Sequence, residues 1–151
     1  MATPDISITQ QAQNMEQFHR LMEVGFGGGD TSVVDELFAP NFVEHQAGVH
    51  PANVEGVKGL IASLHQALPD LRCTIEDTVA DGDTVWARMR GEGTHHGAFM
   101  GRPPTGNAVA ITIIDICRFE GGKVVEHWGV PDRLSMLEQM GIIPRPQQAS
   151  H

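Results

Sequence analysis

Two aspartates, Asp115 and Asp132, are the side chains best placed by the sequence to carry out acid–base chemistry. Asp115 lies in the middle of residues 107–119, an otherwise apolar stretch that is predicted to be a strand. A carboxylate buried there must be paired, protonated or functional. An ion pair with Arg88 or Arg90 on the neighbouring predicted strand is the structural interpretation. The sequence leaves both roles open.

Asp132 follows Trp128 and Pro131, where the last predicted strand ends and a helix begins. One interpretation is an N-cap that accepts hydrogen bonds from the first turn of that helix. The other is a carboxylate at the mouth of a cavity beside a large aromatic side chain, where loss of water makes it a stronger base.

Eight histidines raise the possibility of a metal site. None forms a His-x-x-x-His pair on a helix, and no cysteine accompanies them at ligand spacing, so we expect no metal. His45, inside the apolar stretch 42–45, is better interpreted as a pocket residue or a hydrogen-bonded core histidine. The histidines considered as ligands were His45, His50, His95, His96 and His127.

Other catalytic patterns are missing from the sequence. There is no Gly-x-Ser-x-Gly elbow, neither Cys73 nor Cys117 has a nucleophile motif around it, and no cofactor-binding fingerprint occurs. The remaining choices are acid–base chemistry without a cofactor, or plain binding.

The composition of the chain limits the classes of binding partner that it can have. The chain has 151 residues, with 10 Lys and Arg against 19 Asp and Glu, a net charge of −9. This balance disfavours nucleic acid and anionic membrane surfaces as partners. No apolar run approaches the roughly 18 residues of a membrane span, and no signal peptide is visible, so we expect a cytoplasmic protein. We expect a single domain over 1–151, with a core of about 7–141 and frayed ends at 1–6 and 144–151.

The order of the predicted elements is helices first and strands afterwards. Apolar residues recur at helical spacing until Pro69, and then alternate with a period of two. This order predicts an α+β fold with an antiparallel meander. The predicted helices are 7–26, 30–38, 51–68 and 132–140, and the predicted strands are 72–80, 84–93, 107–119 and 123–128, with a short extended piece at 41–49.

The stretch 107–119 is apolar on both faces, although an antiparallel strand with one wet face should alternate. We therefore expect both faces to be covered, one by the helices and the other by a second copy of the chain. This predicts a homodimer through the outer face of the sheet.

Four motifs carry a resemblance to a known family. They are 42–45 (Phe-Val-Glu-His), 93–106 (Gly-Thr-His-His through Pro-Pro-Thr-Gly), 115–118 (Asp-Ile-Cys-Arg), and 122–128 (ending Glu-His-Trp) followed by Asp132. The chain resembles the SnoaL-like polyketide cyclase branch of the nuclear-transport-factor-2-like (NTF2-like) superfamily, from about Met15 to Gly141.

The resemblance implies a cone-shaped α+β fold, in which a curved antiparallel sheet wraps around the N-terminal helices and leaves a deep apolar pocket. It also implies homodimers and an intramolecular aldol cyclisation of a small apolar carbonyl substrate, without cofactor or metal. Asp132 matches the acid–base residue of the family, and Asp115 replaces a polar residue that is often histidine. We therefore expect Asp132 to act as base and later acid, and Asp115 or His45 as its partner. The expected substrate-binding residues are Trp128, Phe42, Phe99, His95 and Ile113.

Other activities on this fold remain alternatives. A ketosteroid-isomerase type is disfavoured because the chain has no tyrosine. An epoxide-hydrolase type is weakened because Ile113 stands where that type has the arginine of its Arg-x-Asp pair. A non-catalytic, dimeric small-ligand-binding protein is the third alternative. The discriminating observation is whether Asp115 and Asp132 both face one closed cavity.

Overall fold

The computed structural model describes residues 6–147. The N-terminal helix α1 (Ile8–Arg20) continues without a break into a π-helical turn, η1 (Leu21–Phe26). Ser7 caps it, because its side chain accepts a hydrogen bond from the Gln10 backbone nitrogen (3.1 Å). The predicted helix over 7–26 is confirmed in extent, since the glycines that follow end it.

Two further helices complete the first half of the chain. The short α2 (Ser32–Leu37) begins two residues later than predicted and ends one residue earlier, because Phe38 already begins a strand. Helix α3 (Val54–Ala67) begins after Asn53, whose side chain accepts from the Gly56 nitrogen at 3.2 Å.

The sheet has five strands in the order β1-β5-β4-β3-β2. The predicted meander is confirmed, because consecutive strands from β2 to β5 pair antiparallel. The first strand runs parallel to β5, which the sequence did not predict. Proline at position 40 fits this edge position, where one side of the strand needs no partner. The strands are β1 (Phe38–Glu44), β2 (Arg72–Asp81), β3 (Thr84–Thr94), β4 (Ala108–Glu120) and β5 (Lys123–Pro131).

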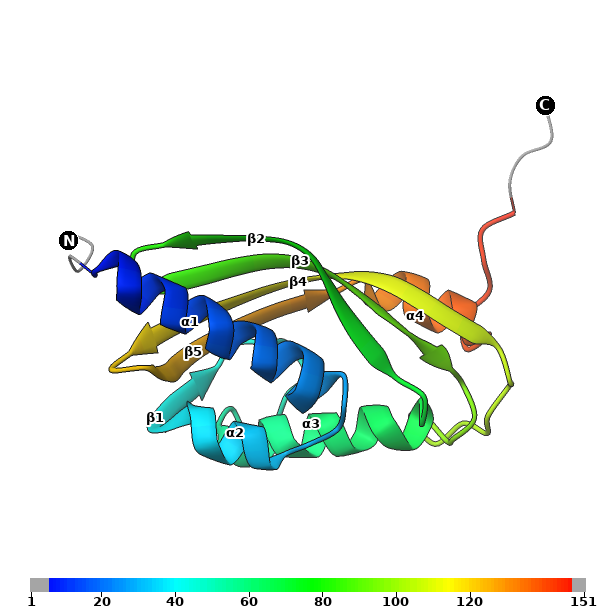
Figure 1. The fold of residues 1–151 in the computed structure, drawn as a ribbon. Helices are drawn as coiled ribbons and strands as arrows, with labels where there is room; N and C mark the ends of the chain where they lie inside the picture. The colour runs from blue at the N-terminus through cyan, green and yellow to red at the C-terminus, as the bar shows by residue number, and fades with distance from the viewer. Residues whose placement is uncertain (1–5, 148–151) are drawn as a thin grey trace.

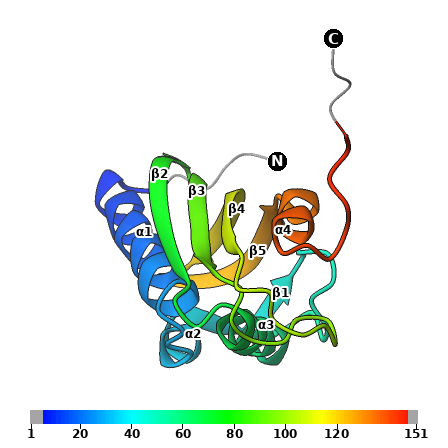
Figure 2. The same cartoon turned by 90° about the vertical axis from the view of Figure 1, so that its right-hand side faces the viewer.

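The strands curve over α1, α2 and α3, as Figures 1 and 2 show. Phe18, Leu21, Ile61 and Phe119 are fully buried between these two layers. The last helix, α4 (Arg133–Gln139), follows β5 and lies at the same end of the molecule as the end of α3 (Figure 1). This is the cone-shaped α+β fold that we expected, open at the end beside α4.

The outer face of the sheet carries exposed apolar side chains. Trp86 is 48% exposed and Val130 66% exposed, and Val43, Val79 and Ile114 accompany them. We call these five residues the outer-face strip. On β4 the inner side chains are buried while Thr112 and Ile114 are exposed, so this strand is covered on one face within the chain.

Two sequence expectations concern the ends of the chain and the membrane. Residues 1–5 and 148–151, most of the segments expected to fray, lie outside the described residues. Within 6–147, no helix has the length and apolar character needed to cross a membrane.

Candidate active site

A cavity of about 360 Å³ opens between the concave face of the sheet, α3 and α4. Most of its wall is apolar. Leu64 and Leu68 contribute from α3 and its end, Ile111 and Ile113 from β4, and three methionines, Met89, Met100 and Met136, from three different parts of the chain. The titratable side chains on the wall are Cys73, Asp115 and Arg133.

Asp115 is the buried acid of this cavity, with 4% of its surface exposed. It points inward because it alternates with outward-facing Ile114 on β4, and its cross-strand neighbour on β5 is Gly129. A Cβ atom at Gly129 would lie 2.7 Å from Asp115 Oδ1 and would also collide with Gln46 Oε1. Glycine at 129 therefore leaves the space that these two side chains occupy.

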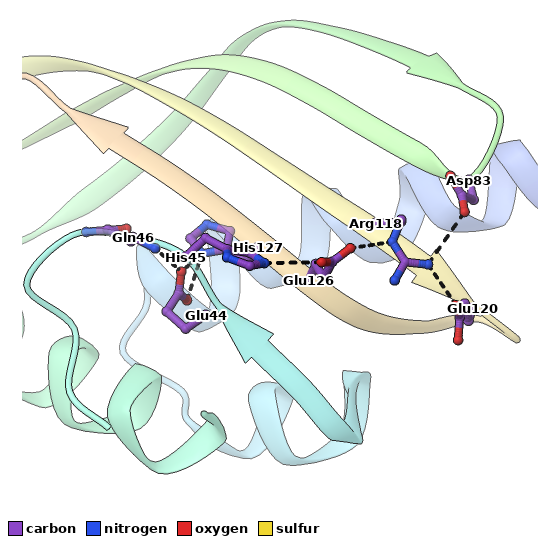
Figure 3. A network of polar contacts seen from close by, with 8 residues as sticks. All are labelled: Glu44, His45, Gln46, Asp83, Arg118, Glu120, Glu126 and His127. Atoms are coloured by element: carbon purple, nitrogen blue, oxygen red, sulfur yellow. Dashed lines mark hydrogen bonds and ion pairs between the residues drawn. The ribbon is translucent and has the colours of Figure 1, made fainter. Parts of the chain in front are cut away.

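Behind Asp115 lies a buried histidine between two carboxylates. His127 Nε2 donates to Asp115 Oδ1 at 2.8 Å, and Nδ1 donates to both oxygens of Glu44 at 2.8 Å. The exposed fraction is 0% for His127 and 4% for each of Asp115 and Glu44, so all three residues are buried. Figure 3 shows the Glu44–His127 half of this set. We call Asp115, His127 and Glu44 the buried triplet.

Strand pairing builds the triplet. Parallel pairing of β1 with β5 sets Glu44 opposite His127, and antiparallel pairing of β5 with β4 brings Asp115 to the same inner face two residues further along. Side chains alternate along a strand, so Glu44 and His127 point inward while their neighbours His45 and Glu126 point outward.

Charge in the triplet follows from its hydrogen bonds. Burial by itself lowers the pKa of His127, but the charges and hydrogen bonds of Asp115 and Glu44 outweigh it and raise that pKa to about 10. His127 is therefore a cation at neutral pH, with both ring nitrogens protonated. No hydrogen bond from residues 6–147 uses Asp115 Oδ2, so this oxygen is the free acceptor on the cavity wall.

Cys73 is a half-buried titratable group on the wall. Burial, with a smaller contribution from Asp115, raises the pKa of its thiol to about 12. The thiol stays protonated at neutral pH, so Cys73 is a poor nucleophile.

The expectation that Asp132 shares a dry cavity with Asp115 is wrong. Asp132 is exposed and caps α4, where its Oδ1 accepts from the Ser135 nitrogen at 3.1 Å. Its neighbours Pro131 and Arg133 line the cavity, whereas Asp132 does not. The free N–H groups of the first turn of α4 hold this carboxylate at the helix end.

His45 and Trp128 were expected in the pocket, but they lie outside it. Their rings stack with centroids 4.7 Å apart and planes 10° apart. His45 Nε2 also lies 3.2 Å from Glu126 Oε1, and its side chain is 35% exposed. These residues occupy the outward-facing positions of β1 and β5, so the prediction that they form the pocket is wrong.

Phe42 and His95 are buried elsewhere. Phe42 packs on Phe38 in the main core, with centroids 4.3 Å apart. His95 is fully buried, its Nδ1 lies 3.0 Å from Thr105 Oγ1, and it does not reach the cavity wall. Phe99 and Ile113 do line the cavity, as predicted for a substrate wall.

The proposed pairing of Asp115 with an arginine is also wrong. Arg88 and Arg90 form ion pairs with Glu76 (3.3 Å) and Glu92 (3.5 Å) instead. They point away from Asp115 because adjacent positions alternate across the sheet.

Sequence reasoning missed Glu44 and His127 as a pair, and Gln46 and Arg133 as wall residues. Glu44 and His127 both lie in motifs that carry the family resemblance. The signal that connects them is the alternation along each strand, which points both side chains to the inner face of the sheet. Their separation of 83 positions hid the contact. Within the part of the chain that the structure describes, no cluster of three or more His, Cys, Asp or Glu side chains is arranged to hold a metal ion.

Comparison with known proteins finds relatives that have the same cone-shaped fold. The family model for SnoaL-like polyketide cyclase matches residues 16–140. IdmH from Streptomyces antibioticus, assigned as a polyketide cyclase, is 36% identical, with 85% of this chain and 99% of that chain covered and a TM-score of 0.76. A protein from Jannaschia sp. CCS1 assigned as a SnoaL-like polyketide cyclase is 26% identical, with coverages of 93% and 99% and a TM-score of 0.81.

AclR from Streptomyces galilaeus, assigned as a hydroxylase, is 28% identical, with coverages of 91% and 87% and a TM-score of 0.81. A search of curated proteins gave no match.

Proposed function

Because the chain belongs to the SnoaL-like polyketide cyclase family, we propose that it is a cyclase-like enzyme in which Asp115 moves a proton on a small, largely apolar carbonyl substrate. The observation that carries the proposal is the free oxygen of Asp115 on the wall of a largely apolar cavity, with the other oxygen held by His127, which Glu44 holds in turn. A carboxylate held in this way has little freedom and little water around it, which favours proton transfer in a fixed geometry.

The proposed reaction is an intramolecular aldol closure. Asp115 accepts a proton from a carbon between two carbonyl groups, and the electrons of that C–H bond become an enolate. The enolate carbon attacks a second carbonyl carbon of the same chain, so one C–C bond forms and a C=O π bond becomes an alkoxide. The proton on Asp115 then returns to the alkoxide, which restores the carboxylate.

The rest of the cavity folds the substrate. Bringing the enolate carbon close to its target carbonyl supplies much of the rate enhancement for such a closure. The apolar side chains of β4, α3 and α4 fit this task, among them Ile113, Leu64 and Met136. His127 acts on Asp115 from behind and does not touch the substrate, so we treat it as a positioning residue.

We assign the base to Asp115 rather than to Asp132. Asp132 supports the site indirectly, since it caps the helix that brings Arg133 and Met136 to the cavity. The deciding experiment follows deuterium incorporation between the carbonyl groups of a β-diketone whose uncatalysed exchange is slow. We expect Asp115→Asn to lose about 10²- to 10⁴-fold of the catalysed exchange.

The matched control is Asp132→Asn, which also removes one carboxylate beside the cavity. We expect its exchange rate to stay within about threefold of the wild type once its stability is taken into account. Wild-type exchange in Asp115→Asn, or a selective loss in Asp132→Asn, would return the base to position 132 and refute the assignment.

A second candidate reaction comes from AclR, since a protein assigned as a hydroxylase shares this fold at 28% identity. Cyclisation adds no atom to the substrate, whereas hydroxylation adds one oxygen, so the product mass separates the two. The third candidate is a non-catalytic ligand-binding protein. The exposed position of Asp132 counts in its favour, because two carboxylates facing one cavity were the feature expected of an enzyme. Such a protein would bind the diketone without exchange.

We also propose that the chain forms a homodimer through the outer-face strip. Trp86 and Ile114 are exposed apolar side chains on adjacent strands, of the kind that dimer interfaces bury. Light scattering on the wild type and on Trp86→Glu tests this, with a dimer expected for the first and a monomer for the second.

A further inference from the structure

Arg133 is a cation on the wall of the cavity without a carboxylate partner in the described chain. It is exposed, lines the cavity, and donates from Nη2 to the Ala47 carbonyl oxygen at 3.0 Å. Within residues 6–147 no Asp or Glu oxygen lies within 4.0 Å of it. Carboxylate partners within this distance are present for Arg20, Arg72, Arg88, Arg90 and Arg118. Arg102 and Arg145 also have none within residues 6–147, but only Arg133 of these three lines the cavity.

The backbone of the segment before α3 positions this guanidinium. A Cβ atom at Gly48 would lie 3.2 Å from Arg133 Nη1, so the arginine packs over a residue that has no side chain. Gly48 has a φ of 86°, which other residues rarely adopt. A guanidinium has five N–H donors, and the bond to Ala47 uses one of them. The others remain available to an anion.

Polarity is graded along the cavity. The exposed lining residues are Gly48, Ser63, Arg133 and one apolar side chain, Met100, and Gln46 on the same wall is half-buried. The buried part contains Met89, Val109 and Ile111. Asp115 belongs to the buried part, and the triplet has two carboxylates for one histidine cation. An anionic group is therefore repelled from the interior and attracted to Arg133.

We infer that the substrate is an amphipathic carboxylate, bound with its anionic end on Arg133 at the mouth and its apolar, carbonyl-bearing part inside the cavity. The inference rests on the proposed function only for the presence of the carbonyl groups near Asp115. A carboxylate accepts two parallel hydrogen bonds from a guanidinium, so Arg133 sets the direction in which the substrate enters. The opposite orientation would bring two carboxylates together in the buried, largely apolar part of the cavity.

The test compares three probes with one carbon skeleton: a linear β-diketone with a terminal carboxylate, its methyl ester, and the corresponding amine. Binding to the full chain is measured by calorimetry at low salt. We expect the carboxylate to bind about three- to tenfold more tightly than the ester, a modest preference because Arg133 is exposed. The amine should bind most weakly at the mouth.

Variants then assign the preference to one side chain. Arg133→Gln should bind the carboxylate and the ester equally, and Arg133→Lys should keep part of the preference, because it keeps the charge and loses the planar fork. Arg88→Gln removes an arginine of the outer face and should bind as the wild type does. Circular dichroism and thermal unfolding verify that each variant is folded.

The inference is overturned if the wild type binds carboxylate and ester equally, or if Arg133→Gln keeps the preference. Failure of the proposed function looks different. Exchange that depends on Asp115 without a carboxylate preference overturns this inference alone. A carboxylate preference that depends on Arg133, with no exchange on any probe, supports this inference and overturns the proposed function alone.

Discussion

Strands β4 and β5 contribute to two polar networks, one on each face of the sheet, that differ in their access to water. On the inner face, His127 joins Asp115 and Glu44 in the buried triplet. On the outer face, Arg118 contacts Asp83, Glu120 and Glu126, and Glu126 reaches His45 (Figure 3). The two networks contain similar groups, and Glu126 and His127 are neighbours in sequence.

Burial decides what each network does. The buried network shifts the pKa of His127 from 6.5 to about 10 against the effect of burial itself. In the outer network the hydrogen bond from Arg118 is the main cause that lowers the pKa of Glu126, and water and salt screen the interaction. The buried network therefore fixes the position of Asp115 on the cavity wall, whereas the outer network consists of ion pairs that water and salt weaken.

The largest effect should come from removing the cation of the buried triplet. His127→Leu leaves the carboxylates of Asp115 and Glu44 buried without a positive charge between them. We expect the free energy of unfolding in urea to fall by about 3–5 kcal/mol. A loss below about 1 kcal/mol would mean that the triplet is no more important for stability than the outer network.

The pH dependence of stability should distinguish the two networks next. The pKa of His127 is raised in the folded protein, so its stabilisation is complete below about pH 6.5 and is lost as pH rises through about 10. We expect the free energy of unfolding to decrease over this range by a few kcal/mol. His127→Gln should lack this slope, and an identical slope in both proteins would exclude His127 as its source.

A carboxylate that belongs to neither network gives the intermediate case. Asp132→Ala removes the N-cap of α4, and we expect a loss of about 1 kcal/mol in the free energy of unfolding. Asp132→Asn serves as the control because asparagine caps equally well. Equal losses in the two variants would show that charge rather than capping matters at this position.

The smallest effect is expected in the outer network. Arg118→Gln should change the free energy of unfolding by less than about 1 kcal/mol, and added salt should reduce the difference further. A loss comparable to that of His127→Leu would contradict the contrast between the two faces.

Local patterns predicted most of the elements. The predicted strands 72–80 and 84–93 are separated by Asp81–Gly82, and 107–119 and 123–128 by the glycine pair 121–122. In the structure Gly82, Gly121 and Gly122 have the positive φ values that tight hairpin turns need. The apolar character of 107–119 correctly predicted that Asp115 is buried within a strand. These features depend on neighbouring residues, so the sequence contains them directly.

The missed features depend on contacts between distant segments. The parallel pairing of β1 with β5 joins residues more than eighty positions apart, as the Glu44–His127 contact at a separation of 83 illustrates. The position of Asp132 was ambiguous for a different reason, since a helix cap and a cavity acid have the same local sequence. Its interpretation depends on which way the chain turns after Pro131.

The three methionines of the cavity wall have a consequence for selectivity. Met89, Met100 and Met136 lie on a strand, a loop and a helix, and each has an unbranched, flexible side chain. Such side chains can change rotamer, so this part of the wall can adapt to ligands of different shapes. Discrimination between ligands then depends on the few polar side chains of the wall, Asp115 and Arg133 among them.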